Sequence, residues 1–464
     1  MKAPQFYNTL SRQIELLPFS AGDEIKLYTC GPTVYDYAHI GNFRAYIFED
    51  LLQRFLEVTG YRVKRVMNFT DVDDKTIRNS RKQGIPLSEF TALYKKAFLE
   101  DLKTLRIQMP SHMPSATDFI PQMIQMIQAL EQKGIAYQAE DGSVYYRISK
   151  FSDYGKLAHL DLETLRPSGR INSDEYEKEN LGDFALWKAV TPEDGEVGWE
   201  SPWGRGRPGW HIECSAMATA LLGETIDIHC GGIDNIFPHH EAEIAQSEAC
   251  SGHRFVKLWM HCEHLRVNNQ KMAKSLGNFY TLRDLLEKGF TGDQVRYALL
   301  SVHYRIPLNF TLEGLEASKQ ALTRIDEWKK RLLSLNFDRS EKVEAASWQK
   351  KFVEALADDL NISKALAVLF DVIRETHRAM DQNSLSQQEA DTHWKAWETI
   401  NQILAIETTT GTTTIPESVQ KLLEERKLAR EKKDFKQSDL LREKMKTLGW
   451  TVKDTPQGQE LRAL

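Results

Sequence analysis

The first seventy residues of this 464-residue chain show two different spacings of apolar residues. Residues 24–30, Glu-Ile-Lys-Leu-Tyr-Thr-Cys, alternate and are rich in β-forming residues, which predicts a strand. From Phe43 the apolar residues recur every three or four positions, which predicts a helix that ends near Gly60. Residues 62–69 predict a second strand. The three elements form a β–α–β unit, which favours a parallel sheet with a right-handed crossover.

The middle of the chain predicts an insertion followed by a return to the sheet. Residues 118–132 have the spacing of a helix, and residues 137–146 alternate around Asp-Gly, which indicates a β-hairpin. Two further strands are expected at 225–229 and 255–260, with a helix near 238–249 between them. Strands that alternate with helices again indicate a parallel sheet.

The C-terminal third predicts helices, from residue 293 to about 406. Six threonines around a glycine at residues 408–414 are typical of a linker, and two more helices are expected after Pro416. Residues 416–464 hold 12 Lys or Arg against 9 Asp or Glu, although the whole chain has a formal net charge of −6. A local basic face can bind RNA on an acidic protein, and a solvated helix pair is the alternative interpretation.

Composition is that of a globular protein with three or more domains. Hydrophobic residues make up 41% and charged residues 27% of the chain. No run approaches the roughly 18 apolar residues of a membrane span, and the N-terminus has no signal-peptide pattern, so we expect a cytoplasmic protein. The five cysteines are scattered and odd in number, which argues against a disulfide framework. They are Cys30, Cys214, Cys230, Cys250 and Cys262.

Two short segments have side chains that suit a nucleoside triphosphate. The tetrad His39-Ile-Gly-Asn42 lies at the expected entrance of the first helix, beyond the carboxyl end of the first strand, where open α/β sheets bind ligands. A helix N-terminus supplies N–H donors, His39 and Asn42 add side-chain donors, and Gly41 lets a nucleotide approach. The alternative for His39 is a residue that only caps the helix.

The second segment, Lys271-Met-Ala-Lys-Ser275, is a lysine loop too polar for the core. Lys271 and Lys274 are two cations beside Ser275, and such a loop can close over phosphates and stabilise the leaving pyrophosphate. The alternative is a surface turn. Either segment alone is weak evidence for ATP, and their joint occurrence favours it.

A metal site is a further hypothesis. His239 and Glu243 are four residues apart and would share one face of the expected helix. Cys30 and Cys214 lie at other carboxyl-edge positions of the expected sheet. Because no CxxC pattern is present, buried free thiols are the alternative interpretation.

Longer runs of this sequence resemble cysteinyl-tRNA synthetases, a family of the class I aminoacyl-tRNA synthetases. The resemblance extends in order from near residue 22 to near residue 300, with a weaker match over the C-terminal helices. The runs that carry it are Cys30–Asp36, His39–Asn42, Gly209–Ser215, Phe237–Glu243 and Lys271–Ser275.

The resemblance implies a role for individual residues. It makes Pro32–Asn42 and Lys271–Ser275 the ATP-binding motifs, with Lys274 on the nucleotide and Asp234 on the ribose. It implies one zinc ion per chain, which reads the substrate thiol, and Mg²⁺ with ATP. The implied zinc ligands are Cys30, Cys214, His239 and Glu243, and the implied substrate-pocket residues are Thr33, Trp210 and His229.

Some nearby residues receive no role. Cys230 stands where bacterial relatives commonly carry glycine, and we expect a spectator thiol, although it could compete for zinc. Cys250 and Cys262 are expected in the core. No role is assigned to His240, Glu241, His261 or His264.

Pattern and resemblance together predict an α/β protein with a Rossmann-like parallel-sheet catalytic domain and an insertion, followed by an α-helical bundle and a small C-terminal module. We expect a monomer whose partners are cysteine, ATP and the tRNA for cysteine. The expected parts are the first half of the catalytic domain (1–116), a connective insertion (117–200), the second catalytic half (201–265), a stem-contact region with the lysine loop (266–319), a helical bundle for tRNA (320–407) and an anticodon-recognition module (416–464).

The implied reaction forms cysteinyl-adenylate and pyrophosphate and then passes the acyl group to the 3′ end of tRNA. Three alternatives stay open: a ligase that joins cysteine to an amino-sugar and lacks the anticodon region, a non-enzymatic RNA- or zinc-binding relative, and a generic nucleotidyltransferase. The terminal module argues against the first of these. Its candidate phosphate contacts are Arg426, Arg430, Lys432, Lys433, Lys436 and Arg442.

Overall fold

The computed structural model describes residues 3–160, 167–171, 181–337, 345–406, 417–432, 434–448, 450–455 and 458–463. The chain divides into two compact units, Met1–Ile406 and Glu407–Leu464. Within the described ranges, no helix combines the length and apolar character needed to cross a membrane.

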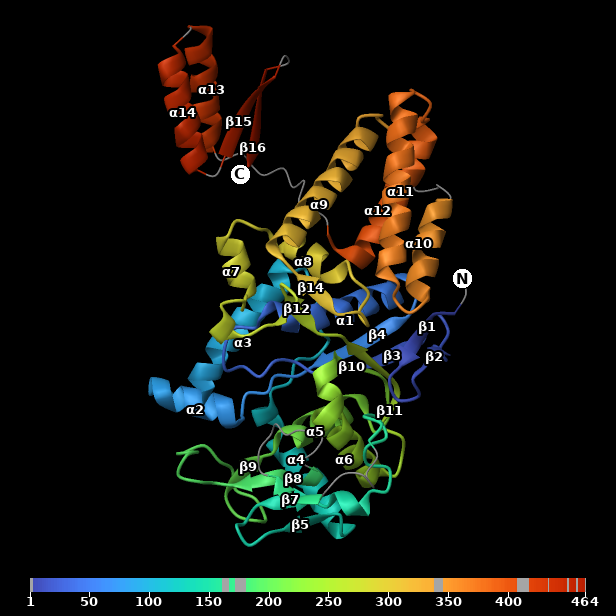
Figure 1. Ribbon diagram of the computed structural model, residues 1–464, viewed down its shortest axis with the longest axis vertical. Helices are drawn as coiled ribbons and strands as arrows, with labels where there is room; N and C mark the ends of the chain where they lie inside the picture. Colours follow the sequence, from blue (N-terminus) through green and yellow to red (C-terminus); the bar gives the residue numbers. More distant parts are fainter. Residues whose placement is uncertain are drawn as a thin grey trace. The chain divides into compact units, whose positions relative to one another are not determined.

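A four-stranded parallel sheet forms the centre of the first unit (Figure 1). The predicted β–α–β unit is confirmed, since β3 and β4 pair in parallel and α1 connects them. The two later strands pair in parallel and complete the sheet on the free edge of β3. In spatial order the strands are β11 (Val256–Cys262), β10 (Ile226–Gly232), β3 (Glu24–Thr29) and β4 (Arg62–Met67).

Helix α1 (Ile40–Val58) begins in a capping box. The backbone N–H of Asn42 donates to His39 Nδ1 at 3.1 Å, and the N–H of His39 donates to Asn42 Oδ1 at 3.1 Å. These reciprocal bonds satisfy two backbone donors that a helix start leaves unpaired. The apolar face of α1, which includes Phe43 and Ile47, is fully buried against the sheet. The sequence therefore fixes both the start and the buried face of this helix.

The insertion forms its own small sheet. A 3₁₀ turn (Ala116–Phe119) leads into α4 (Ile120–Gln132), and the predicted hairpin is confirmed in β5 (Ala136–Gln138) and β6 (Val144–Tyr146). The apolar side chains of this part share one core with residues of two catalytic-domain helices, such as Met217 and Ala242. The other elements here are β7 (Pro167–Ile171), β8 (Leu181–Ala189), β9 (Gly206–Pro208), α5 (Trp210–Leu222) and α6 (Glu241–Ser251).

Several short elements surround the central sheet. A hairpin at the N-terminus and a three-stranded sheet beyond β11 fall outside the strands that the sequence predicts. The expectation of unbroken helices from residue 293 is wrong at β14, which pairs in parallel with β12. These elements are β1 (Gln5–Asn8), β2 (Gln13–Leu16), α2 (Asp74–Gln83), α3 (Leu87–Thr104), β12 (Leu265–Val267), β13 (Gln270–Lys271), α7 (Leu282–Glu287), α8 (Gly292–Leu300) and β14 (Leu308–Phe310).

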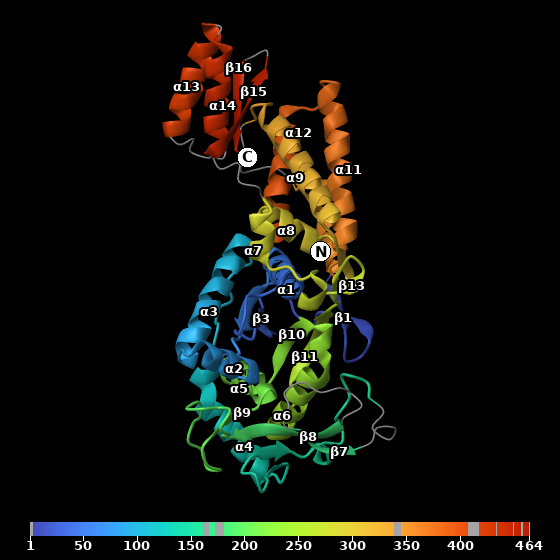
Figure 2. The same ribbon diagram turned by 60° about the vertical axis from the view of Figure 1, so that its left-hand side comes forward.

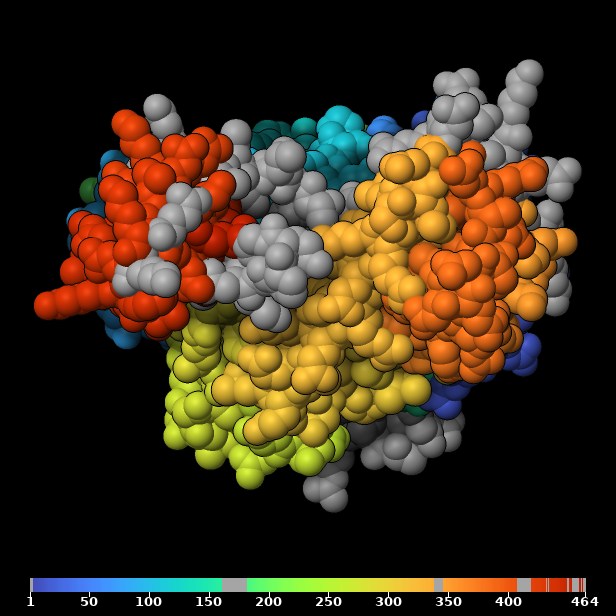
Figure 3. Space-filling model, turned by 90° about the horizontal axis from the view of Figure 1, so that it is seen from above, coloured from blue at the N-terminus to red at the C-terminus, as the bar shows by residue number. Residues whose placement is uncertain are grey.

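Four helices then pack against one another. Their residues form the orange region of the space-filling view (Figure 3). They are α9 (Leu312–Leu333), α10 (Ser347–Ala357), α11 (Ile362–Asp381) and α12 (Gln387–Leu404). The stripe of Leu322, Ile325, Trp328 and Leu332 is buried, which is the usual role of an apolar helix face.

The second unit is a helix pair with a hairpin. The two helices expected after Pro416 are confirmed as α13 (Glu417–Glu431) and α14 (Phe435–Thr447), followed by β15 (Trp450–Thr455) and β16 (Gly458–Ala463). Their small core contains Val419, Met445, Trp450 and Val452. The predicted threonine linker at 408–414 and the candidate contact Lys433 lie outside the described residues.

Candidate active site and metal centre

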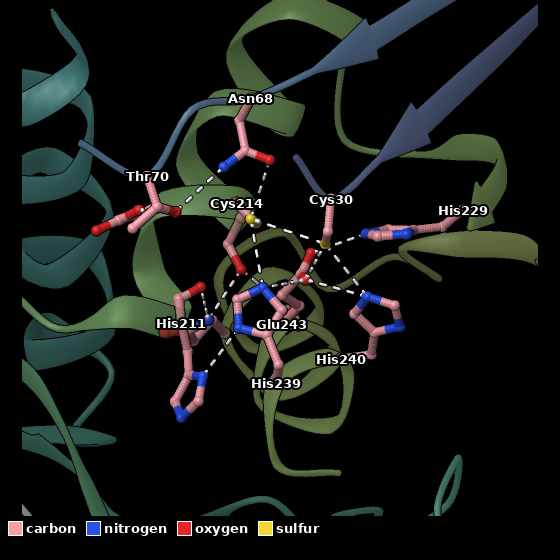
Figure 4. Close-up of polar contacts among 12 residues, drawn as sticks. Cys30, Asn68, Thr70, His211, Cys214, His229, His239, His240 and Glu243 are labelled. Carbon is pink, nitrogen blue, oxygen red and sulfur yellow. Dashed lines mark hydrogen bonds and ion pairs between the residues drawn. The ribbon is translucent and has the colours of Figure 1, made fainter. Parts of the chain in front are cut away.

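Polar side chains from four elements converge at the carboxyl edge of the central sheet (Figure 4). Cys30 follows β3 directly, and His229 lies on β10. Cys214 comes from α5 and Glu243 from α6. Residues more than 200 positions apart in the chain therefore reach one small volume.

The four residues expected to bind zinc lie together. One donor atom each of Cys30, Cys214, His239 and Glu243 falls within 4.8 Å of the other three. His239 Nε2 lies 3.3 Å from Cys214 Sγ and 3.1 Å from Glu243 Oε1. The two sulfurs are 4.0 Å apart. This spacing lets four donors surround one ion.

The local structure around His239 differs from the expectation. His239 lies in the turn Ile236–His240, and α6 begins only at Glu241, so the pair with Glu243 does not sit on one regular helix. The four-residue spacing still brings the two side chains together, because the backbone at His240 and Glu241 is already helical.

A second set of donors overlaps the first. Cys30, His229, His240 and Glu243 also have donor atoms within 4.8 Å of one another. Glu243 bridges the sets, since its Oε2 lies 3.0 Å from His229 Nε2 while its Oε1 contacts His239. His240, which received no role from the sequence, has its Nε2 3.3 Å from Cys30 Sγ. The one feature of the sequence that could have suggested a role for His240 is its position next to His239.

The donor chemistry fits zinc. Thiolate sulfur, neutral imidazole nitrogen and carboxylate oxygen are the ligands that Zn²⁺ takes in proteins. Burial lowers the pKa of His239 to about 3, so its imidazole is neutral. Burial, with the neighbouring Cys214, raises the pKa of the Cys30 thiol. Acidic groups this close together disfavour each other's ionisation, and a bound dication compensates the repulsion between their negative charges.

Neighbouring side chains hold these donors in place. The Trp210 ring stacks on His239 with 4.2 Å between ring centroids, and His211 Nδ1 lies 3.0 Å from His239 Nδ1. Asn68 Oδ1 accepts a hydrogen bond from the backbone N–H of Gly31 at 3.0 Å and lies 3.7 Å from Cys214 Sγ. Asn68 was not identified from the sequence.

A chain of hydrogen bonds continues from this asparagine. The Thr70 hydroxyl lies 3.4 Å from Asn68 Nδ2 and donates to Glu213 Oε2 at 2.8 Å. Thr33, expected in the substrate pocket, forms a parallel bridge with Thr70. The loop after β3 is therefore tied to the loop after β4.

The side chains expected at ATP lie around the start of α1. A Cβ on Gly41 would come within 2.9 Å of His39 Nδ1 and 3.3 Å of Met272 Cε, so the lysine loop packs closely over this glycine. The N–H of Ile40 donates to the carbonyl of Tyr280 at 3.0 Å. Asp234 lies in a 3₁₀ turn after β10, and its charge opposes the burial that lowers the pKa of His39.

The lysine loop itself is an exposed turn. Asn278 braces it, because its Oδ1 accepts from the N–H of Ala273 at 2.8 Å and its Nδ2 donates to the carbonyl of Lys271 at 3.2 Å. Lys274 Nζ lies 2.5 Å from Asp36 Oδ2. Lys271 and Ser275 are exposed.

Cys230 points away from the metal donors. It belongs to neither donor set and packs in the apolar core beside Met260 and Cys262. Successive residues of a strand face opposite sides, so its neighbour His229 faces the donors while Cys230 faces α1.

Comparison with known proteins agrees with this geometry. Residues 17–320 match the class I (C) tRNA synthetase catalytic domain, residues 351–407 a DALR domain, and residues 412–462 the cysteinyl-tRNA ligase anticodon binding domain. Cysteine–tRNA ligase of Protochlamydia amoebophila is 54% identical, with 99% of this chain and 97% of the relative covered. That of Chlamydia muridarum is 51% identical, with 99% of both covered.

The chain belongs to the cysteine–tRNA ligase family. The expected family, the enzyme class and the α/β fold are thereby confirmed. A match to the anticodon-binding domain of this family disfavours the amino-sugar alternative, in which that region is lacking.

Solved structures show the same class I fold. Methionyl-tRNA synthetase of Mycobacterium tuberculosis, in complex with methionyl-adenylate, superimposes with a TM-score of 0.59 at 15% identity. The match covers 83% of this chain and 90% of that one. At this identity the likeness concerns the fold alone.

Proposed function

We propose that this member of the cysteine–tRNA ligase family joins cysteine and ATP into cysteinyl-adenylate, with release of pyrophosphate, and then transfers the cysteinyl group to the 3′ end of its tRNA. The observation that carries the proposal is the convergence of two thiols, an imidazole and a carboxylate at the sheet edge that also holds the capped start of α1. This convergence supports a sulfur-selective site beside a phosphate-binding one, as the reaction requires.

Zinc would be held by Cys30, Cys214, His239 and Glu243. The bound ion supplies a position that favours a thiolate ligand over a neutral hydroxyl, and so separates cysteine from serine. Glu243 also accepts from His229 in this arrangement, which keeps its second oxygen occupied.

The walls of the cysteine pocket would be Thr33, Trp210 and His229. Trp210 keeps His239 oriented by stacking on it, and its bulk limits the size of the substrate side chain. His229 is completely buried and stacks on Trp259, so it forms a rigid floor.

ATP would bind at the start of α1, with Mg²⁺ on its phosphates. His39 and Asn42 would donate to phosphoryl oxygens where charge builds up, and Lys271 and Lys274 would stabilise the leaving pyrophosphate. Asp234 would accept from the ribose. Gly41 would allow close approach of the nucleotide to the backbone, and Ser275 would bind beside the two lysines of the loop.

The remaining parts would bind tRNA, and the reaction would take place in the cytoplasm, where its substrates are found. In this proposal residues 320–407 and the stem-contact region 266–319 carry the body of the tRNA, and residues 416–464 read the anticodon. Four of the phosphate contacts that the sequence suggested are exposed and support the last assignment: Arg430, Lys432, Lys436 and Arg442. Arg426, suggested with them, is instead buried and donates to Gln459 Oε1 at 2.7 Å, so it serves the core of this unit rather than a phosphate.

Metal analysis with cysteine-dependent ATP–pyrophosphate exchange tests the proposal. We expect wild-type protein to contain about one zinc per chain, and Cys214→Ser to lose zinc and to raise the KM for cysteine at least about tenfold. Cys230→Ser is the matched control, because it removes a buried thiol outside the donor sets. Equal zinc content and equal KM in Cys214→Ser and wild type would refute the ligand assignment.

A further inference from the structure

A cavity of about 540 Å³ lies beside the carboxyl end of α3, between that helix, α1 and the end of α12. Helix α3 lies at the left edge of the first unit in Figure 2. Among the described residues, the lining contains three cations, Arg54, Lys103 and Arg106, and no acid. Leu99 and Met109 also line the cavity and are still 37% and 51% exposed. The cavity therefore presents both positive charge and large apolar side chains to solvent.

Arg54 fixes the shape of this cavity. It donates to the backbone carbonyls of Gln402 and Arg106, at 3.1 and 2.8 Å. Its Nε lies 2.8 Å from Asp50 Oδ2. Arg106 is held in turn, with its Nε 2.7 Å from Asp293 Oδ1. These contacts join α1, the segment after α3 and the end of α12, so the three walls are tied together.

Positive charge remains after these ion pairs are counted. Arg296, beneath the cavity, shares Asp50 with Arg54, so four cations face the two carboxylates of Asp50 and Asp293. This leaves an excess of two positive charges in a protein that is negative overall. Within the part of the chain that the structure describes, neither Lys103 nor Lys96 takes part in an ion pair.

The outer face of α3 leads to the cavity. Its residues Ala92, Lys96, Leu99 and Lys103 are all exposed, and their spacing of four, three and four residues puts them along one side of the helix. The neighbouring acid, Glu100, is paired with an arginine of α7. The two apolar residues and the two lysines each repeat after seven positions, which is the repeat with which one helix packs lengthwise on another.

We propose that this α3 face and the cavity at its end bind an acidic amphipathic helix of another protein. Carboxylates seven residues apart on such a helix are separated by roughly 10 Å, as Lys96 and Lys103 are on α3. An apolar residue between them would cover Leu99, and a larger one would enter the cavity against Met109. Complementary charge selects an acidic partner, and such helix-on-helix recognition uses anchors at this spacing.

The exposed apolar side chains favour a protein over an RNA. A phosphate backbone would pair with the lysines but would leave Leu99 and Met109 in water, whereas exposed apolar residues rimmed by polar ones mark protein-binding surfaces. The α3 face is also separate from the proposed chemistry, since none of the residues assigned to cysteine, zinc or ATP lines this cavity. Binding there should leave adenylate formation unchanged.

A labelled synthetic peptide of three heptads tests the proposal. It carries glutamate every seven residues, with leucine between, and a scrambled peptide of equal composition is its control. We expect a micromolar Kd for wild type and about tenfold weaker binding to Lys96→Glu/Lys103→Glu, since two ion pairs become repulsions. A peptide with lysine in place of glutamate should instead prefer the double variant. Lys319→Glu/Lys330→Glu, two exposed lysines of α9, should keep the wild-type affinity.

Met109→Gln separates the apolar contact from the charges. We expect weaker peptide binding with an unchanged dependence on salt, because this variant alters no charge. Cysteine-dependent ATP–pyrophosphate exchange should stay at the wild-type level in all these variants and reports an intact fold.

Three results would overturn the proposal. The first is equal binding of the patterned and scrambled peptides, or wild-type affinity in the lysine double variant. The second is a raised KM for tRNA in that variant, which would assign the α3 face to RNA. The third is self-association of wild type in sedimentation that the double variant loses, which would make the occupant a second copy of this chain.

Discussion

Lys274 of the lysine loop and Asp36 of the loop before α1 form an ion pair, with 2.5 Å between Nζ and Oδ2. The lysine side chain is 66% exposed and the carboxylate 34%. Phe279 completes the arrangement, because its ring lies 5.1 Å from Lys274 Nζ and meets the His39 ring edge to face. The pair holds the lysine that would contact ATP against an acid that would repel phosphate.

Exchange of Asp36 for asparagine should therefore release Lys274. Exposed ion pairs contribute about 0.2–1 kcal/mol, so we expect Asp36→Asn to lower the KM for ATP by a factor of roughly 1.5 to 5 with kcat nearly unchanged. Pyrophosphate exchange at varied ATP measures both. Glu100→Gln, which breaks an exposed pair with Arg283, is the control. A higher KM would mean that Asp36 positions the lysine for the substrate.

The variant Gly41→Ala should lose activity while its stability stays nearly unchanged. Alanine is favourable inside a helix by up to about 1 kcal/mol, yet its Cβ would come within 2.9 Å of His39 Nδ1 and displace the ring. We expect an almost unchanged melting temperature and a loss of about 100-fold in kcat/KM for ATP. Gly314→Ala, in the first turn of α9, should leave activity intact. Full activity of Gly41→Ala would contradict the role given to His39.

Arg296 should be important for stability. It is fully buried, its Nη2 lies 2.6 Å from Asp50 Oδ2, and it donates to the carbonyls of Leu404 and Leu105. Removal of one partner of a buried pair costs about 3–5 kcal/mol, and Arg54, which also binds Asp50, favours the lower end for Arg296→Met. The shift of the urea midpoint measures this cost. Arg374→Met, which breaks an exposed pair, should shift the midpoint little.

The buried carboxylate of Asp50 predicts that the folded protein loses stability at acid pH. Burial alone would raise the pKa of Asp50, but Arg296 and Arg54 outweigh it and lower the pKa below its ordinary value. A depressed pKa in the folded state stabilises the protein above the unfolded-state pKa of about 3.9, and this contribution is lost as the pH falls through the folded value. Urea midpoints measured below about pH 4 should therefore fall steeply in wild type.

Asp50→Asn supplies the comparison for that loss of stability. The urea midpoint of Asp50→Asn should be lower than that of wild type at neutral pH, because Arg296 loses its charged partner. It should also change less with pH through the acid range. An equally steep fall in the variant would show that other carboxylates set the acid limit.

Local pattern was sufficient to predict much of the fold. The period of α1, its N-cap at His39 and the alternation of β3 are properties of neighbouring residues, so the β–α–β unit could be predicted. The strand β14 could not be predicted in this way. It has three residues and depends on its partner β12, 43 positions earlier by the pairing of Leu308 with Leu265.

The environment of the site was less accessible to sequence reasoning. Asn68 and His240 contact Cys214 and Cys30, but each contact joins segments 146 or more residues apart. Such pairs depend on how strands and helices pack, which no local pattern contains. The position of His239 before α6 was missed for a related reason, since the residues around Pro238 have a helical spacing without forming the helix.

Because side chains alternate along β10, the register of this strand decides which residue faces the metal donors. A shift by one residue would turn His229 into the apolar core and expose the Cys230 thiol to the donors, which would create a competing sulfur. Strand β10 is hydrogen-bonded on both sides, to β3 and to β11, and both sets of hydrogen bonds oppose a shift of its register. Backbone pairing in the middle of the sheet thus keeps the Cys230 sulfur away from the metal donors.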